Sequence, residues 1–207
     1  MALDTYTKLK QQIIDWSHRG DLDLKVDLFI QMAEQDMFAN DDAVLKVRGE
    51  ETRSTATTDG KYLALPDDFQ SMRSLLITTA GGDIELIQKA PAQMFDEPTT
   101  GLPCFFSVTS QIEFDRVPDS NYEMMMQYYA EPTPLSSDNA TNSILTNFPN
   151  IYLFGSLAAA ATWAEDFEVA ASHYATFIRA IKGANKKDKQ GRYGPAPALT
   201  LVGQGIA

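Results

Sequence analysis

The residues of this chain that could do chemistry are two histidines, one cysteine and 28 carboxylates among 207 residues. A nucleophile needs a base within reach, and histidine is the usual one. His18 follows a predicted helix beside Arg19, where an imidazolium interacts favourably with the helix dipole. His173 lies in a helical spacing that predicts a place at the edge of a core. Neither histidine belongs to an HxxxH or HExxH spacing, so the sequence predicts no zinc site.

Adjacent carboxylates fall in predicted turns or at helix ends, where capping and solvation account for them. They are Asp41-Asp42, Glu50-Glu51, Asp67-Asp68, Asp96-Glu97 and Glu165-Asp166. Gly81-Gly82 lies in a hairpin turn and lacks the spacing of a phosphate-binding loop. We therefore expect no catalytic, cofactor-binding or metal-binding residues. A rival interpretation is a small metal-dependent enzyme whose carboxylates come from separate turns, for example Asp67 and Asp115.

Composition and charge exclude several classes of protein. With 44% hydrophobic and 22% charged residues the chain is typical of a folded protein. The net charge of −11 argues against nonspecific binding to nucleic acid. The single cysteine, Cys104, excludes an intramolecular disulfide and a cysteine-cluster metal site. The charged opening segment and the lack of a long apolar run predict a soluble, intracellular protein that does not insert into a membrane.

Apolar spacing predicts an N-terminal helical hairpin over residues 1–48. The first helix is expected to start at an Asp4 cap and to end at Gly20. Its apolar face is Tyr6, Leu9, Ile13 and Trp16. The second helix is expected to start near Asp21 or Asp23 and to run to about Val47. Its face is Val26, Phe29, Ile30, Ala33, Met37, Val44 and Val47.

The middle of the chain, residues 49–136, predicts an inserted small antiparallel β-domain of about five or six strands. A turn at Ala80–Asp83 is expected to join two strands as a hairpin. Further strands are expected at Phe105–Val108, Ile112–Phe114 and Tyr122–Tyr129, and Met124 to Met126 are expected to fill the core. Pro132 and Pro134 close this section, since proline does not fit a central strand.

Helical periodicity returns over residues 137–190. We expect a short helix capped by Thr141 or Asn142, a longer one from Ile151 to Ala164, and a last one from Asp166 to about Lys187. These C-terminal helices are expected to pack on the N-terminal hairpin. Residues 191–207, with Gly191, Gly194, Pro195 and Pro197, predict an extended tail. The fold class is thus α+β, with terminal helices forming a helical bundle around a β insert.

Charge is segregated along the chain. Residues 179–192 carry a net charge of +5, which leaves −16 for residues 1–178. Three interpretations stay open: compensation of a helix dipole by a solvated end, a docking arm that orders on a partner, or weak nucleic-acid binding. The candidate partner-binding residues are Arg179, Lys182, Lys186, Lys187, Lys189, Arg192, Tyr193, Leu199 and Leu201.

An ordered set of short patterns extends over nearly the whole chain. It comprises Tyr-x-x-Leu-Lys-x-x-Ile-x-x-Trp at Tyr6–Trp16, Phe-Ile-x-x-Ala-Glu at Phe29–Glu34, Tyr-Leu-Ala-Leu-Pro-x-Asp-Phe at Tyr62–Phe69, Gly-x-Pro-x-x-Phe-x-Val at Gly101–Val108 and Gln-Tyr-Tyr-Ala at Gln127–Ala130. Together these patterns resemble the head-to-tail adaptor, or connector, proteins of short-tailed bacteriophages.

This resemblance implies a structural virion protein and not an enzyme. Such adaptors dock under the portal protein as a ring of about twelve copies, bridge it to tail proteins of the nozzle or fibres, and continue the DNA channel. The genomic DNA passes through without specific binding. Assembly in the host cytoplasm, location in the neck of the virion, and a monomeric state before a portal templates the ring are also implied. A non-virion binding or assembly module is the remaining alternative.

Overall fold

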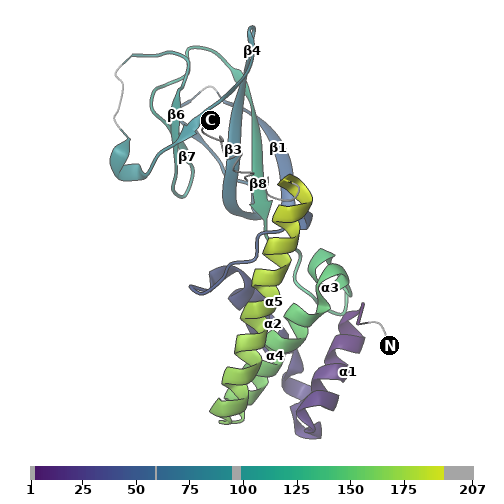
Figure 1. Ribbon diagram of the computed structural model, residues 1–207. Coiled ribbons are helices and arrows are strands. Elements are labelled where there is room, and N and C mark those ends of the chain that lie inside the picture. Colours follow the sequence, from purple (N-terminus) through teal and green to yellow (C-terminus); the bar gives the residue numbers. More distant parts are fainter. Residues whose placement is uncertain (1–2, 59, 95–98, 194–207) are drawn as a thin grey trace, which may run out of the picture. The chain divides into compact units, whose positions relative to one another are not determined.

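The computed structural model describes residues 3–58, 60–94 and 99–193 (Figure 1). The chain divides into two compact units. The helical unit joins the residues up to Val47 with those from Phe148 onward, and the β unit is Arg48–Asn147. The fold class is α+β, as the sequence predicts. Among the described residues, no helix combines the length and apolar character needed to span a membrane.

The helical unit is organised around α4 (Pro149–Trp163), which packs against α1 (Tyr6–Ser17), α2 (Val26–Ala39) and α5 (Phe167–Tyr193). A 3-10 helix, η1 (Gly20–Lys25), joins α1 to α2. Figure 1 shows these helices side by side. The buried residues of α4 lie all round its axis: Ile151, Tyr152, Leu153, Gly155, Ser156, Leu157, Ala158 and Ala160. A helix that is apolar all round must be enclosed by its neighbours.

At Gly155, side chains of two neighbouring helices lie close to the backbone of α4. A Cβ atom built at this position would lie 2.9 Å from the Cβ of Ala33 on α2 and 3.0 Å from the ring of Phe177 on α5. Both distances are shorter than ordinary van der Waals contact, so only glycine lets the three backbones meet here. The buried face predicted for α2 is confirmed, because Phe29 and Ile30 before Ala33 and Met37 after it are buried.

Helix boundaries differ from the predictions in several places. The first helix ends at Ser17 and not at Gly20, and the second starts at Val26 and not near Asp21 or Asp23, because residues Gly20–Lys25 form η1. Thr5, not Asp4, caps α1 by accepting a hydrogen bond from Lys8 N, and Asp4 forms an ion pair with Lys8. The second helix ends at Ala39, because Asn40 is extended and its Oδ1 accepts a 2.8 Å bond from Asp42 N. Such Asx turns compete with helix formation. The last helix continues to Tyr193, so residues 191–193 are helical where a tail is expected.

The described residues of the β unit form eight strands, more than predicted. One sheet is antiparallel with the order β1 (Glu51–Thr58), β8 (Tyr122–Ala130), β3 (Phe69–Thr79) and β4 (Gly82–Glu85). The other has the order β2 (Tyr62–Leu63), β7 (Ile112–Phe114), β6 (Phe105–Val108) and β5 (Ile87–Gln88). The β5 and β6 strands pair in parallel, so the insert is not purely antiparallel.

Apolar side chains from both sheets form the core of the β unit. The predicted hairpin is confirmed as β3 and β4, and Met124 and Met126 are buried as expected. The short segments of this unit are η2 (Arg48–Glu50), η3 (Pro91–Gln93) and α3 (Ser143–Asn147). Asn142 caps α3 through a 2.9 Å bond from Leu145 N to its Oδ1, as predicted. Ser143 Oγ donates to the buried carboxylate of Glu50.

The contact at Gly155 predicts the effect of a larger side chain. Gly155→Val should lower the free energy of unfolding by about 1–3 kcal/mol, because the added carbons cannot fit without moving α2 or α5. Gly183 on α5 is the matched control, since nothing lies within 4 Å of a Cβ at that position. Gly183→Val should not destabilise the protein. Equal denaturant midpoints for the two variants would refute the packing argument.

Candidate partner-binding surface

The outward face of α5 carries a row of cations. Arg179, Lys182, Lys186 and Lys189 are exposed and follow one another at intervals of three or four residues, which places them on one side of the helix. We call this row the basic stripe. Ile181, Ala184 and Asp188 on the other side are buried. The residues predicted from sequence to bind a partner therefore include a continuous surface.

Two contacts hold the basic end of α5 in place. The side chain of Asn185 donates a 2.8 Å hydrogen bond to Val44 O and accepts a 2.9 Å bond from Lys46 N. These bonds pair the helix with the extended segment that follows α2. Lys187 lies outside the stripe, with its Nζ 5.8 Å from the ring centre of Phe148, which is within the range of a cation–π interaction.

The cations of the basic stripe form no ion pair with any residue that the structure describes. Like charges spaced three or four residues apart on a helix repel one another. Such a row is stabilised when an anionic surface covers it. Arg192 and Tyr193 lie in the last turn of α5. Leu199 and Leu201, the predicted apolar anchors, lie outside the described residues.

The structure also exposes apolar side chains that sequence analysis did not single out. Leu24, Leu28 and Met32 are 95%, 51% and 41% exposed. Leu28 and Met32 lie on the side of α2 opposite its buried stripe, and Leu24 precedes them by four residues in η1. The interval of four residues was already present in the sequence. Trp16 is predicted to lie on the apolar face of the first helix, yet it is 51% exposed. Phe167, at the start of α5, is 67% exposed.

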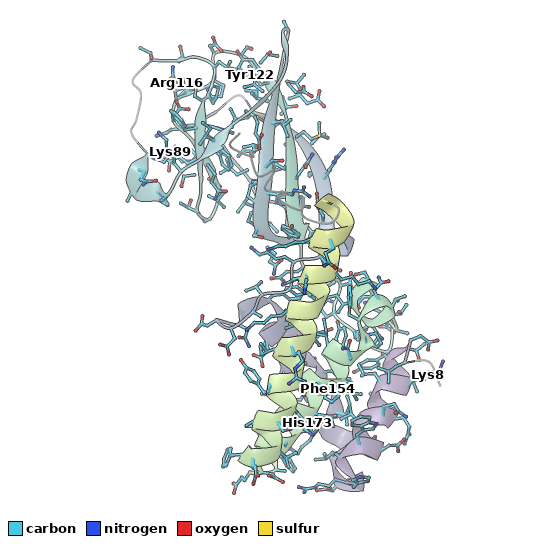
Figure 2. The ribbon with its side chains drawn as sticks, in the orientation of Figure 1. Lys8, Lys89, Arg116, Tyr122, Phe154 and His173 are labelled. Atoms are coloured by element: carbon cyan, nitrogen blue, oxygen red, sulfur yellow. The ribbon has the colours of Figure 1, made fainter. Side chains whose placement is uncertain are left out.

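Neither histidine forms an acid–base pair with a residue in the described part of the chain. His18 is the left-handed C-cap of α1, with φ at 52°. His173 on α5 lies beside Phe154 of α4, with ring centres 6.0 Å apart (Figure 2). Partial burial lowers the pKa of His173, because the charged imidazolium loses solvation there. This position at the edge of the core agrees with the prediction.

The carboxylates of the rival interpretation have different environments. Asp115 is 3% exposed, and its Oδ1 accepts bonds of 3.0 Å from Cys104 N and 3.2 Å from Phe105 N. Its Oδ2 accepts a 3.1 Å bond from Arg116 Nε (Figure 2). Asp67 is exposed. Asp115 therefore holds the start of β6 in place, and the described part of the chain gathers no group of three or more His, Cys, Asp and Glu suited to a metal ion.

A comparison with protein families gives one match. The family described as "SU10 adaptor protein" matches residues 4–199, which is almost the whole chain. No curated protein matches the chain.

Because Asp115 accepts backbone hydrogen bonds, its replacement is expected to lower the stability of the protein. Asp115→Ala should lower the free energy of unfolding of the β unit by about 1–3 kcal/mol, because two backbone amides and Arg116 lose their acceptor. Asp115→Asn keeps one acceptor oxygen and should lose less. Asp67→Ala is the control and should stay within about 0.5 kcal/mol of the unchanged protein. If Asp115→Ala is as stable as Asp67→Ala in urea unfolding, the structural role is wrong.

His173 predicts a pH dependence of stability. In the unfolded chain its imidazole takes up a proton near pH 6.5, whereas the folded protein resists protonation. The free energy of unfolding should therefore fall as the pH decreases from about 6.5 toward the lowered folded pKa. His173→Gln should show a shallower fall between pH 7 and 5 in urea titrations. Ser172→Gln, on the same helix, should keep the original slope; equal slopes for the two variants would contradict this assignment.

Proposed function

Because the chain belongs to the SU10 adaptor family, and is thus a head-to-tail adaptor of a short-tailed bacteriophage, we propose that it docks under the portal protein as a ring. The ring contains about twelve copies related by cyclic symmetry. It connects the portal to nozzle or fibre proteins of the tail and continues the channel through which the genome leaves. The subunit assembles in the host cytoplasm and remains in the neck of the virion.

The observation that carries the docking proposal is the basic stripe. It combines four exposed cations on one helix face with a fixed backbone, because Asn185 joins α5 to residues 44–46. Because the backbone beneath the cations is already held, binding costs only the freedom of their side chains, which favours specific docking. The adjoining Lys187, Arg192 and Tyr193, with Leu199 and Leu201 beyond them, extend the proposed contact toward the C-terminus.

The acidic remainder of the chain supports the channel proposal. Residues 1–178 carry a net charge of −16. A negative wall forms no contacts that release counterions from DNA phosphates, so DNA can slide past it. The proposed role requires no catalytic residue and no cofactor. It rests on contacts between proteins, and the genome passes without being bound.

The docking proposal predicts the effect of charge reversal at the end of α5. Lys186→Glu, Lys187→Glu and Lys189→Glu together should weaken retention of the chain on purified portal rings by about tenfold or more. The triple replacement by arginine is the control, because it keeps the charge and should keep binding. Retention is measured by pull-down at about 0.1 M salt, where exposed charges still interact over about 10 Å.

The circular dichroism spectrum of the triple glutamate variant should match that of the unchanged protein, because all three lysines are exposed. Lys187 makes one cation–π contact at the surface, with Phe148. Undiminished retention of the folded glutamate variant would show that this end of α5 does not contribute to docking.

A further inference from the structure

The outer face of α2 changes character along its length. Leu28 and Met32 expose apolar surface in its first half, and Leu24 does so in η1 just before it. Asp36 continues this row by one more step of four residues and is exposed, and Asp41 and Asp42 are exposed just after the helix. We call these six residues the α2 row. It is apolar in its first half and acidic in its second.

The outer face of α5 shows a matching change. Phe167 is 67% exposed at its start. Ala171 and Ala175 follow at intervals of four residues, are exposed, and leave room for another helix to approach. The basic stripe begins at the next step, with Arg179. This face is apolar in its first half, apart from the flanking Glu168, and basic in its second.

Contacts inside the helical unit place the two faces at the same level. Phe29 of α2 lies 6.2 Å from the ring of Trp163, just before α5 begins. Asn40 Nδ2 donates a 2.6 Å bond to Tyr174 Oη, and Val44 O accepts from Asn185. The two segments therefore run in the same direction, with their apolar parts level with each other.

The same two hydrogen bonds, from Asn40 to Tyr174 and from Asn185 to Val44, place the acidic half of the α2 row level with the start of the basic stripe. Asp41 and Asp42 come between Asn40 and Val44, so they lie between the levels of Tyr174 and Asn185. Arg179 and Lys182 occupy the same interval on α5. Within the described chain these two cations form no ion pair with either acid. Asp42 Oδ2 accepts a long, 3.4 Å bond from Tyr174 Oη, but the charges of both faces have no charged partner among the described residues.

We propose that the α2 row of one copy binds the outer face of α5 on the next copy from Phe167 to Lys182, while Lys186 and Lys189 at the end of the basic stripe remain for the portal. This inference rests on the proposed ring and names the two surfaces that build it. A contact between different faces of identical subunits is heterologous and closes into a ring by rotation. Rotation about an axis parallel to the helices leaves each residue at the same height along that axis. Apolar side chains of one copy therefore meet apolar side chains of the next, and Asp41 and Asp42 meet Arg179 and Lys182.

A second copy is the occupant that fits both faces. An antiparallel pairing would place the basic stripe against Leu24 and Leu28 and would bury cations without partners, which is costly. A basic partner would suit only the acidic half of the α2 row, and an acidic one only the stripe. A parallel neighbour of the same chain supplies the complement to both.

The test is a charge exchange within the full chain, assembled on purified portal rings. Arg179→Glu with Lys182→Glu should lower the number of copies retained per portal by about tenfold or more, since two attractions become repulsions. Asp41→Lys with Asp42→Lys should have the same effect. The chain that carries all four substitutions should regain assembly, because each of its copies again offers complementary faces.

This restoration separates contacts between copies from contacts with the portal, because the portal is unchanged throughout. Recovery by the fourfold variant supports the inference. The inference is overturned if both double variants lose assembly and the fourfold variant does not recover it. It is also overturned if either double variant assembles fully. In both cases the proposed ring is not contradicted. If the unchanged chain does not bind portal rings at all, the proposed function fails and the inference falls with it.

Disulfide trapping gives a second, independent readout in a Cys104→Ser background. A Met32→Cys chain and a Phe167→Cys chain are mixed and assembled on the portal. Each should form a disulfide only with the other variant, because the two positions lie at the same height along the helices. Met32→Cys mixed with Lys189→Cys is the control, since Lys189 lies far along α5 beyond Asn185. Cross-links in the control but not in the level-matched mixture would refute the pairing.

Discussion

The structure of the helical unit depends on the enclosure of α4. This helix is apolar all round, so α1, α2 and α5 must cover it, and Gly155 lets two of them approach within contact of its backbone. The covering helices come from both ends of the chain, with the β unit inserted between them. Once α4 is covered, the outer faces of α2 and α5 remain exposed, and these faces carry the segregated charge.

Much of this arrangement could be predicted from the sequence, because buried helices leave a strong periodic signal. The stripe from Val26 to Met37, the hairpin of β3 and β4 and the Asn142 cap are confirmed. The strand β1 was not predicted, since its sequence Glu-Thr-Arg-Ser-Thr-Ala-Thr-Thr lacks apolar alternation and its pairing with β8 decides its structure. The early end of α2 depends on one side-chain bond from Asn40, which periodicity cannot show.

The candidate surface was predicted in part. The bases of α5 were identified from charge alone, but only the structure shows that four of them form one stripe while Lys187 turns toward Phe148. The exposed row on α2 was overlooked because the buried row of the same helix dominates its pattern. Family membership identifies the chain as a phage head-to-tail adaptor. The contact between the faces of α2 and α5 is our proposal for how such a subunit joins its neighbours.

The central claim is that this chain is a building block of the virion neck. Quantitative mass spectrometry of purified mature particles tests it most directly, with portal peptides as the internal standard. The account predicts that the chain is present in a fixed ratio to the portal, as two stacked rings require. Particles that are infectious and contain the portal but lack this chain would contradict it.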